Sequence, residues 1–134
     1  MATACDMRYA TADAFFTIFE TVIGMTADVG TFPRLVQQIP EGLVRELAYT
    51  GRRMGAAEAK SAGLVNRVFD TQEEMLEGVF AIAHEIATKA PLAVYGCKRM
   101  INYSKDHTTA DTLDYIAIWN ASMLQAQEMQ EAMQ

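Results

Sequence analysis

Glycine and proline are unevenly distributed along the chain, and this feature constrains its fold most strongly. Most of the eight glycines and three prolines lie before residue 71, where they separate short runs rich in aromatic and β-branched residues. From residue 71 onward both are rare, and apolar residues recur at helical spacing. Because glycine and proline interrupt regular helices, the sequence predicts an α/β part over residues 1–70 and a helical part over residues 71–134.

The α/β part is predicted to contain three short strands. Residues 6–10 and 14–19 have the alternation or the aromatic and branched content of strands, and Ala12-Asp13 between them is typical of a turn. Residues 64–69 form the third predicted strand.

One loop and three helices are predicted between the second and the third strand. Residues 24–30 carry two glycines and no clear period, which predicts a loop. Asp28 in this loop is placed to cap a short helix that contains Pro33. The helices that follow are predicted from Pro40 to the glycine at position 51, and over residues 56–62 with Gly63 just beyond.

The helical part has clear start signals. Thr71 and Glu74 form a capping-box pattern, Pro91 begins a second helix, and Thr108 or Thr109 caps a third. The third helix is apolar on more than one side, which favours subunit contacts, although a core helix within one chain remains the alternative. Its apolar residues are Leu113, Ile116, Ala117, Trp119, Met123, Leu124 and Met129.

Composition argues against several functional classes. The formal net charge is −6, and the only basic cluster is Arg52-Arg53, so we expect neither a nucleic-acid partner nor an anionic membrane surface. No apolar run is long enough to span a bilayer. Cys5 and Cys97 lack neighbours at metal spacing, so we expect two small core residues in a reducing compartment, and no metal, flavin or nicotinamide.

Neither end of the sequence carries a recognisable address. Residues 1–6 lack the basic and apolar regions of a signal peptide. The last residues, 130–134, are not a peroxisomal tripeptide signal.

Two carboxylates stand out by their surroundings. Glu20 follows an apolar run, Asp28 lies between Ala27 and Val29, and no Lys or Arg occurs over residues 10–33. Two carboxylates in an apolar pocket without cations are expected to have raised and separated pKa values, so that one can act as a base and the other as an acid. The alternative is that Glu20 ends a strand in solvent and Asp28 only caps a helix.

Several short motifs follow one another in a characteristic order along essentially the whole chain. They are Cys5–Ala10, Asp13–Phe16, Glu20, Gly24, Ala27–Gly30, Arg34-Leu35, Tyr49–Arg52, Ala56–Ala59, Gly63–Val68, Ala90–Val94, Lys98, Tyr103–His107 and Trp119–Gln125. This order resembles the enoyl-CoA hydratase/isomerase, or crotonase, superfamily. Within it, Ala27-Asp28-Val29-Gly30 is similar to the dienoyl-CoA isomerases, whereas enoyl-CoA hydratases typically have glycine at the Asp28 position.

This resemblance implies both a fold and a reaction. The fold is the C-terminal part of a ββα spiral followed by a helical region that builds trimers, often paired into hexamers. The reaction converts a 3,5-dienoyl-CoA into a 2,4-dienoyl-CoA in fatty-acid β-oxidation, with Glu20 taking the C2 proton and Asp28 supplying the C6 proton, or the reverse. Lys98 matches a lysine that approaches the CoA phosphates, although a solvated helix lysine is the simpler reading.

The resemblance further implies that the chain corresponds to the C-terminal half of such an enzyme. The oxyanion-hole amides and a third acid would then lie outside it, and the chain alone would be inactive. No cofactor is implied beyond the coenzyme A thioester substrate. The compartment is mitochondrial or peroxisomal in a eukaryote and cytoplasmic in a bacterium. Enoyl-CoA hydration and a non-catalytic oligomerisation module remain the alternatives.

Overall fold

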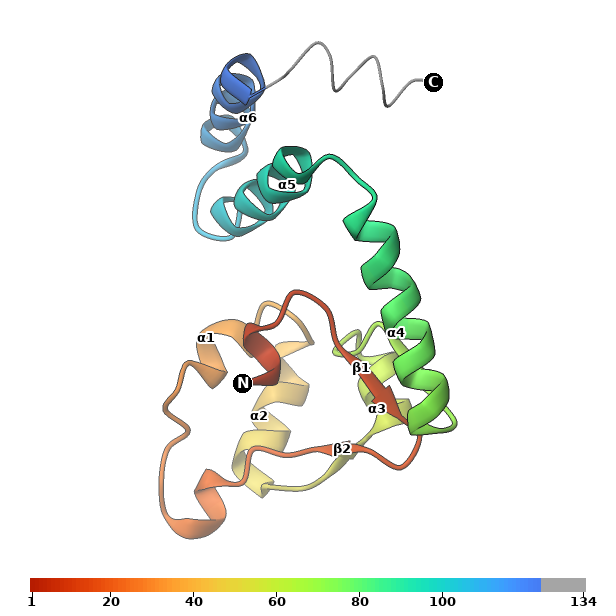
Figure 1. The fold of residues 1–134 in the computed structure, drawn as a ribbon. Coiled ribbons are helices and arrows are strands. Elements are labelled where there is room, and N and C mark those ends of the chain that lie inside the picture. The colour runs from red at the N-terminus through yellow and green to blue at the C-terminus, as the bar shows by residue number, and fades with distance from the viewer. Residues whose placement is uncertain (124–134) are drawn as a thin grey trace. The chain divides into compact units, whose positions relative to one another are not determined.

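The computed structural model describes residues 1–123, which form two compact units. The first comprises Met1–Phe80 and the second begins at Ala81, so the boundary falls inside helix α4, Gln72–Ala87 (Figure 1). The predictions that involve Leu124, Gln125 and Met129 lie outside the described residues. The functional division at residue 70 stays a prediction.

The three predicted strands are present but shorter than predicted, and a fourth, β3, was not predicted. β1, Tyr9–Thr11, pairs in parallel with β4, Arg67–Phe69, and β2, Phe15–Phe16, pairs antiparallel with β3, Met54–Gly55. Within residues 1–123 each strand has one partner, so its ladder ends where that partner ends. The turn between β1 and β2 is confirmed, because the Ala14 NH donates to the Thr11 carbonyl at 3.0 Å.

The α-helices of the first unit begin and end close to the predicted residues. They are α1, Thr31–Leu35, α2, Glu41–Thr50, and α3, Ala56–Ser61. Two 3₁₀ helices, η1, Ala2–Ala4, and η2, Glu20–Ile23, were not predicted.

The predicted capping role of Asp28 is wrong. The N-cap of α1 is Gly30, two residues later, and no side chain caps it. The Asp28 carboxylate instead accepts from the neighbouring Val29 NH at 2.7 Å. The short side chain of Asp28 is therefore engaged within its own loop, before the helix begins.

The core of the first unit lies on the inner face of α2. Val44, Leu47 and Ala48 of α2 are buried against Met54 and Ala59, which come from the two elements that follow. Fully burying a side chain of the size of Leu47 stabilises the fold by about 1.5–3 kcal/mol. α2 is thus the rigid element against which the loops of this unit pack.

The start signals of the second part are confirmed. The Glu74 NH donates to the Thr71 hydroxyl at 3.2 Å at the start of α4. Pro91 begins α5, Pro91–Tyr103. Thr108 caps α6, Thr109–Met123, because its hydroxyl accepts from the Asp111 NH at 3.2 Å while the Asp111 carboxylate accepts from the Thr108 NH.

Helices α5 and α6 pack through aromatic side chains. The Trp119 indole lies directly on Gly96, where any larger residue would collide with it. The rings of Tyr95 and Trp119 are 5.8 Å apart between centroids, and Arg99 donates to the Tyr115 hydroxyl at 2.9 Å. Glycine at position 96 therefore lets the two helices approach closely.

The two cysteines correct a prediction. Cys5 and Cys97 are exposed, not buried in a core. Cys5 follows the exposed helix η1, and α5 buries only Gly96 among its residues. Two helices packed along one narrow stripe leave their other apolar positions open, so an apolar sequence context did not imply burial here.

Replacing Gly51 with alanine is expected to destabilise the protein. Gly51 ends α2 at φ +64°, and an added Cβ would collide with the Val22 side chain. The left-handed backbone alone costs a non-glycine residue about 1–2 kcal/mol. Urea denaturation followed by circular dichroism measures the loss. Gly42→Ala in the same helix is the matched control: an added Cβ there meets nothing within 4 Å. This variant is expected to gain up to about 1 kcal/mol. Equal stability of the two variants would contradict the analysis.

Candidate functional site

The segment that carries Glu20 is anchored on the C-terminal end of α2. The Thr21 hydroxyl donates to the Ala48 carbonyl at 2.7 Å, and the Thr17 hydroxyl donates to the Gly51 carbonyl at 3.0 Å. The Val22 side chain lies against Gly51. Contacts from three side chains therefore hold η2 in place on a helix whose inner face is buried in the core.

Glu20 opens this 3₁₀ turn. Its backbone carbonyl accepts from the Met25 NH at 2.9 Å, and Gly24 ends the turn in the left-handed region. The Glu20 residue is half-buried in the described chain. The alternative in which Glu20 ends a strand is wrong, because β2 ends at Phe16.

Asp28 lies in the loop between η2 and α1. Ala27 before it is buried and anchors the loop, whereas Asp28 itself is exposed. Arg34 reaches back from α1, donating to the carbonyls of Val29 at 3.2 Å and Gly30 at 3.0 Å. Arg34 therefore closes the loop that presents Asp28.

The side chains around the two acids are mostly apolar, and the nearby Arg34 guanidinium donates to backbone carbonyls of the Asp28 loop, not to either acid. Neither Glu20 nor Asp28 forms an ion pair within residues 1–123. Because Asp28 is exposed, these residues by themselves do not build the dry cavity expected from the sequence. They do present five large apolar side chains, each between 52% and 73% exposed, around the acids: Phe19, Val22, Ile23, Met25 and Val29.

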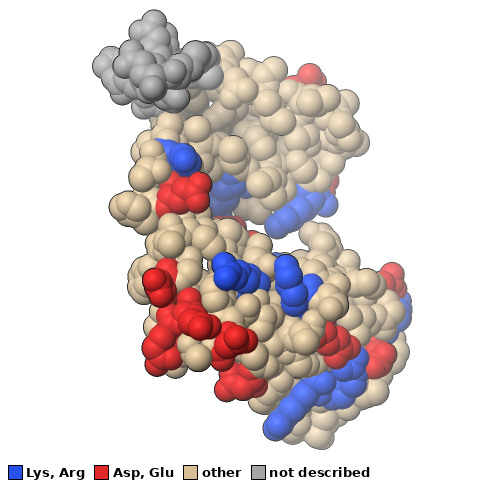
Figure 2. Space-filling model, turned by 90° about the vertical axis from the view of Figure 1, so that its right-hand side faces the viewer, with Lys and Arg blue, Asp and Glu red and all other residues tan. Residues whose placement is uncertain are grey.

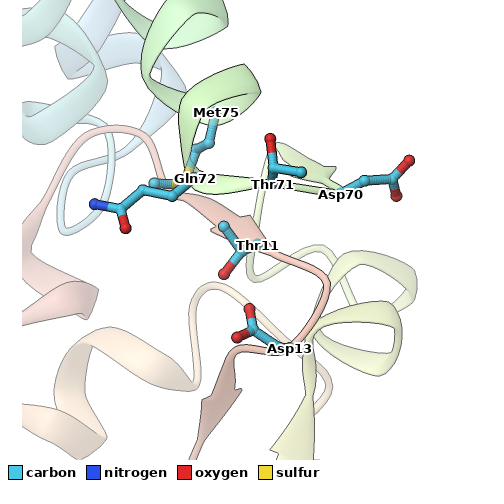
Figure 3. Close-up of a pocket in the computed structure, with 6 residues that line it drawn as sticks. All are labelled: Thr11, Asp13, Asp70, Thr71, Gln72 and Met75. Carbon is cyan, nitrogen blue, oxygen red and sulfur yellow. The ribbon is translucent and has the colours of Figure 1, made fainter.

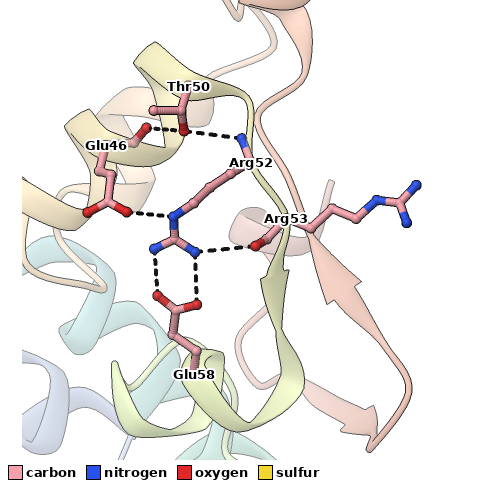
Figure 4. A network of polar contacts seen from close by, with 5 residues as sticks. All are labelled: Glu46, Thr50, Arg52, Arg53 and Glu58. Atoms are coloured by element: carbon pink, nitrogen blue, oxygen red, sulfur yellow. Dashed lines mark hydrogen bonds and ion pairs between the residues drawn. The ribbon is translucent and has the colours of Figure 1, made fainter.

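Arg52, which follows α2, connects the end of this helix to α3. Figure 4 shows its guanidinium bridging two carboxylates, with Nε donating to Glu46 at 2.6 Å and two terminal nitrogens donating to Glu58 at 2.9 and 2.6 Å. The hydrogen bonds from Arg52 lower the pKa of Glu58, and those to Glu58 and Glu46 raise the pKa of Arg52. Arg52 therefore has a structural role at the end of α2.

An open pocket of about 440 Å³ lies elsewhere in the first unit. It is lined by Thr11 at the end of β1, by Asp13 in the following turn, and by residues 70–72 and Met75 at and just before the start of α4. In Figure 3 the Asp70 carboxylate points away from Asp13, so the two acids do not converge on one point. Neither Glu20 nor Asp28 lines this pocket.

Lys98 lies on α5, in the second compact unit, and is exposed. Its predicted contact with CoA phosphates stays a prediction. On the face drawn in Figure 2, Lys and Arg form separate groups with acidic and uncharged surface between them, not a continuous basic stripe. Among the described residues, no helix combines the length and apolarity needed to cross a bilayer.

Comparison with known proteins connects this arrangement to one family. The family described as enoyl-CoA hydratase/isomerase matches residues 1–134. The chain belongs to this family. It is 48% identical over its full length to the human mitochondrial Delta(3,5)-Delta(2,4)-dienoyl-CoA isomerase. It is 42% identical over 98% of its length to the peroxisomal isomerase of the same name from Arabidopsis thaliana.

A solved structure supports the family fold. The enoyl-CoA hydratase from Mycobacterium tuberculosis H37Rv matches 98% of this chain with a TM-score of 0.89 and 29% identity. The predicted α/β class and the family resemblance are thus confirmed for this member of the enoyl-CoA hydratase/isomerase family.

The chain spans less than half of the isomerases that it resembles. It covers 41% of the human protein, 48% of the Arabidopsis protein and 52% of the solved hydratase. The expectation that it is the C-terminal half of such an enzyme is not borne out by these matches.

The Arg52 cluster predicts an acid-sensitive stability. The pKa of Glu58 is lowered by Arg52, so its ionised form favours the folded state. This contribution is fully present above the ordinary glutamate pKa and is lost as pH falls through the lowered value. We expect Arg52→Gln to lower the melting temperature more at pH 7 than at pH 3, as measured by circular dichroism. An equal loss at both values would contradict an electrostatic role. Arg45→Gln, which removes an exposed ion pair with Glu41 inside α2, is the control.

Proposed function

We propose that this chain supplies the two acid–base groups of a dienoyl-CoA isomerase, which shifts the double bonds of a 3,5-dienoyl-CoA to the 2,4 positions. The observation that carries the proposal is the segment of residues 20–28, which presents two carboxylates without cation partners among exposed apolar side chains. The identity to isomerases of this name supports the same substrate class.

Two carboxylates suit the chemistry because two separate protons move. One proton leaves C2 beside the thioester carbonyl and another arrives at C6, four bonds away. Glu20, half-buried and held on α2, is proposed to take the C2 proton, and exposed Asp28 to deliver the C6 proton. A positioned side chain that transfers a proton typically contributes about 10²–10⁴-fold to the rate.

The intermediate is a thioester dienolate, whose negative oxygen requires aligned NH donors. One such donor is worth roughly 3–4 kcal/mol in known enzymes. Asp28 and the apolar side chains around it are exposed in the described residues. The complete enzyme is therefore proposed to need further protein surface that excludes water from this segment and supplies the oxyanion donors.

Three further features belong to the same proposal. Lys98 would contact the CoA phosphates. The exposed apolar residues of α5 and α6, Ile101, Leu113 and Ile118, would be covered in a homotrimer or hexamer. The compartment would be a mitochondrion or peroxisome in a eukaryote, as in the names of the relatives, or the cytoplasm in a bacterium.

Isotope exchange can separate the roles of the two acids. In the complete enzyme, Glu20→Gln is expected to abolish both isomerisation and exchange of the C2 proton with deuterated water. Asp28→Asn is expected to lower isomerisation about 10²–10⁴-fold while C2 exchange continues, because the base remains. Product formation is followed by the absorbance of the 2,4-diene, and exchange by mass spectrometry. The opposite pattern would reverse the assignment, and full activity of both variants would overturn the proposal.

The second candidate reaction, enoyl-CoA hydration, is favoured by the name of the solved structure that this chain resembles. Asp28→Gly in the complete enzyme distinguishes the two reactions. An isomerase loses diene formation, whereas a hydratase keeps water addition to a 2-enoyl-CoA. The variant Asp6→Asn, outside the segment of residues 20–28, is the control.

The chain of 134 residues is expected to be inactive by itself. Asp28 is exposed and Glu20 is only half-buried, so an enolate formed beside them would lack both enclosure and a donor pair. The turnover of the chain is compared with that of a longer protein containing it, at equal concentration. Turnover within tenfold of the longer protein would contradict the requirement for further surface. Native mass spectrometry of the same samples tests the trimer and, if acyl-CoA binding is absent, the alternative of a pure oligomerisation module.

A further inference from the structure

We propose that Thr17 and Thr21 are positioning residues that hold the Glu20 turn on the end of α2 at the height required for proton transfer. This inference rests on the proposed function of Glu20. The evidence is the pair of hydroxyl-to-carbonyl hydrogen bonds that connect two segments about thirty positions apart in the chain, Thr21 to Ala48 and Thr17 to Gly51.

The acceptors of these bonds are carbonyls that α2 leaves without an intrahelical partner. The last four carbonyls of any helix lack the NH group one turn further on. Here the Gly51 NH donates to Leu47, and the Arg52 NH donates to the Thr50 hydroxyl instead of the Ala48 carbonyl. The Thr21 hydroxyl donates to the Ala48 carbonyl, so both the hydroxyl and the carbonyl gain a hydrogen-bond partner.

The C-terminal end of α2 is itself held in place, so hydrogen bonds to it fix the position of the Glu20 turn. Leu47 and Ala48 are buried in the core, and Arg52 connects the residues after the helix to Glu46 and Glu58. The η2 turn itself contains four residues and exposes Val22 and Ile23. Without the hydroxyl bonds, the Glu20 turn would be held by the Val22 contact with Gly51 and by Ile18, which is buried two residues before Glu20. Neither contact fixes the turn by a directional hydrogen bond.

A shift of the turn by about 1 Å is enough to matter. Misplacing a catalytic group by this amount typically costs about 10²-fold in rate, whereas substrate binding depends on many other contacts. Removal of the Thr21 hydroxyl should therefore lower kcat while KM stays nearly constant. A purely structural role would lower the amount of folded enzyme without changing the kcat of the folded fraction.

The test is Thr21→Val in the complete enzyme, with Thr21→Ser as the conservative variant. We expect Val to lower kcat about 10–100-fold with KM within about twofold, and Ser to restore most of the rate because it keeps the hydroxyl. Thr88→Val, which removes a hydroxyl bonded to the Glu85 carbonyl near the end of its own helix, is the matched control and should keep wild-type kcat. Thr17→Val supplies a second variant if Thr21→Val fails to fold.

Hydrogen exchange provides a readout that does not depend on catalysis. The Met25 NH, bonded to the Glu20 carbonyl, should exchange faster in Thr21→Val than in the wild type. Faster exchange with unchanged kcat, in an enzyme that Glu20→Gln inactivates, overturns the positioning role. Unchanged exchange overturns the anchoring itself. Loss of rate in Thr21→Val that serine does not restore also overturns the proposal. If Glu20→Gln is fully active, the proposed function fails and the exchange result still decides the anchoring.

Discussion

The C-terminal end of α2 is the constraint on which the candidate site depends. At this point Gly51 turns the chain in a conformation that favours glycine, Arg52 connects the turn to Glu46 and Glu58, and Thr17 and Thr21 donate to its free carbonyls. The same helix buries Val44, Leu47 and Ala48 in the core. Core packing therefore sets the place of Glu20 through one helix end, which explains why so short a 3₁₀ turn can have a defined position.

Local signals in the sequence predicted the helices well because each signal acts within a few residues. Thr71 and Thr108 donate or accept within one turn, and the glycine at position 51 needs only its own backbone freedom. Strand length could not be predicted in the same way. β1 and β2 extend only as far as β4 and β3 pair with them, and those partners lie 38 to 58 positions away in the chain.

The candidate site could be predicted only in part from the sequence. The absence of basic residues near Glu20 and Asp28 was visible, and the structure agrees with the lack of ion pairs, but their chemistry rested on family resemblance. The anchoring by Thr17 and Thr21 was missed, because threonines at a spacing of four carry no signal about an acceptor on another helix. The prediction that both cysteines are buried failed for a related reason: apolar neighbours in sequence do not reveal which side of an element is covered, whether beside η1 for Cys5 or on α5 for Cys97.

The two carboxylates are held by independent means, and this has a chemical consequence. Glu20 depends on side chains that bond to the end of α2, whereas the loop of Asp28 is closed by Arg34 from α1. Gly24, in the left-handed region, separates the two anchored stretches. Because neither anchor contains a group of the other, a change at one should alter one proton transfer and leave the second largely intact. A reaction that moves two protons at distant carbons favours such an arrangement, since each carboxylate can be placed for its own carbon without displacing its partner.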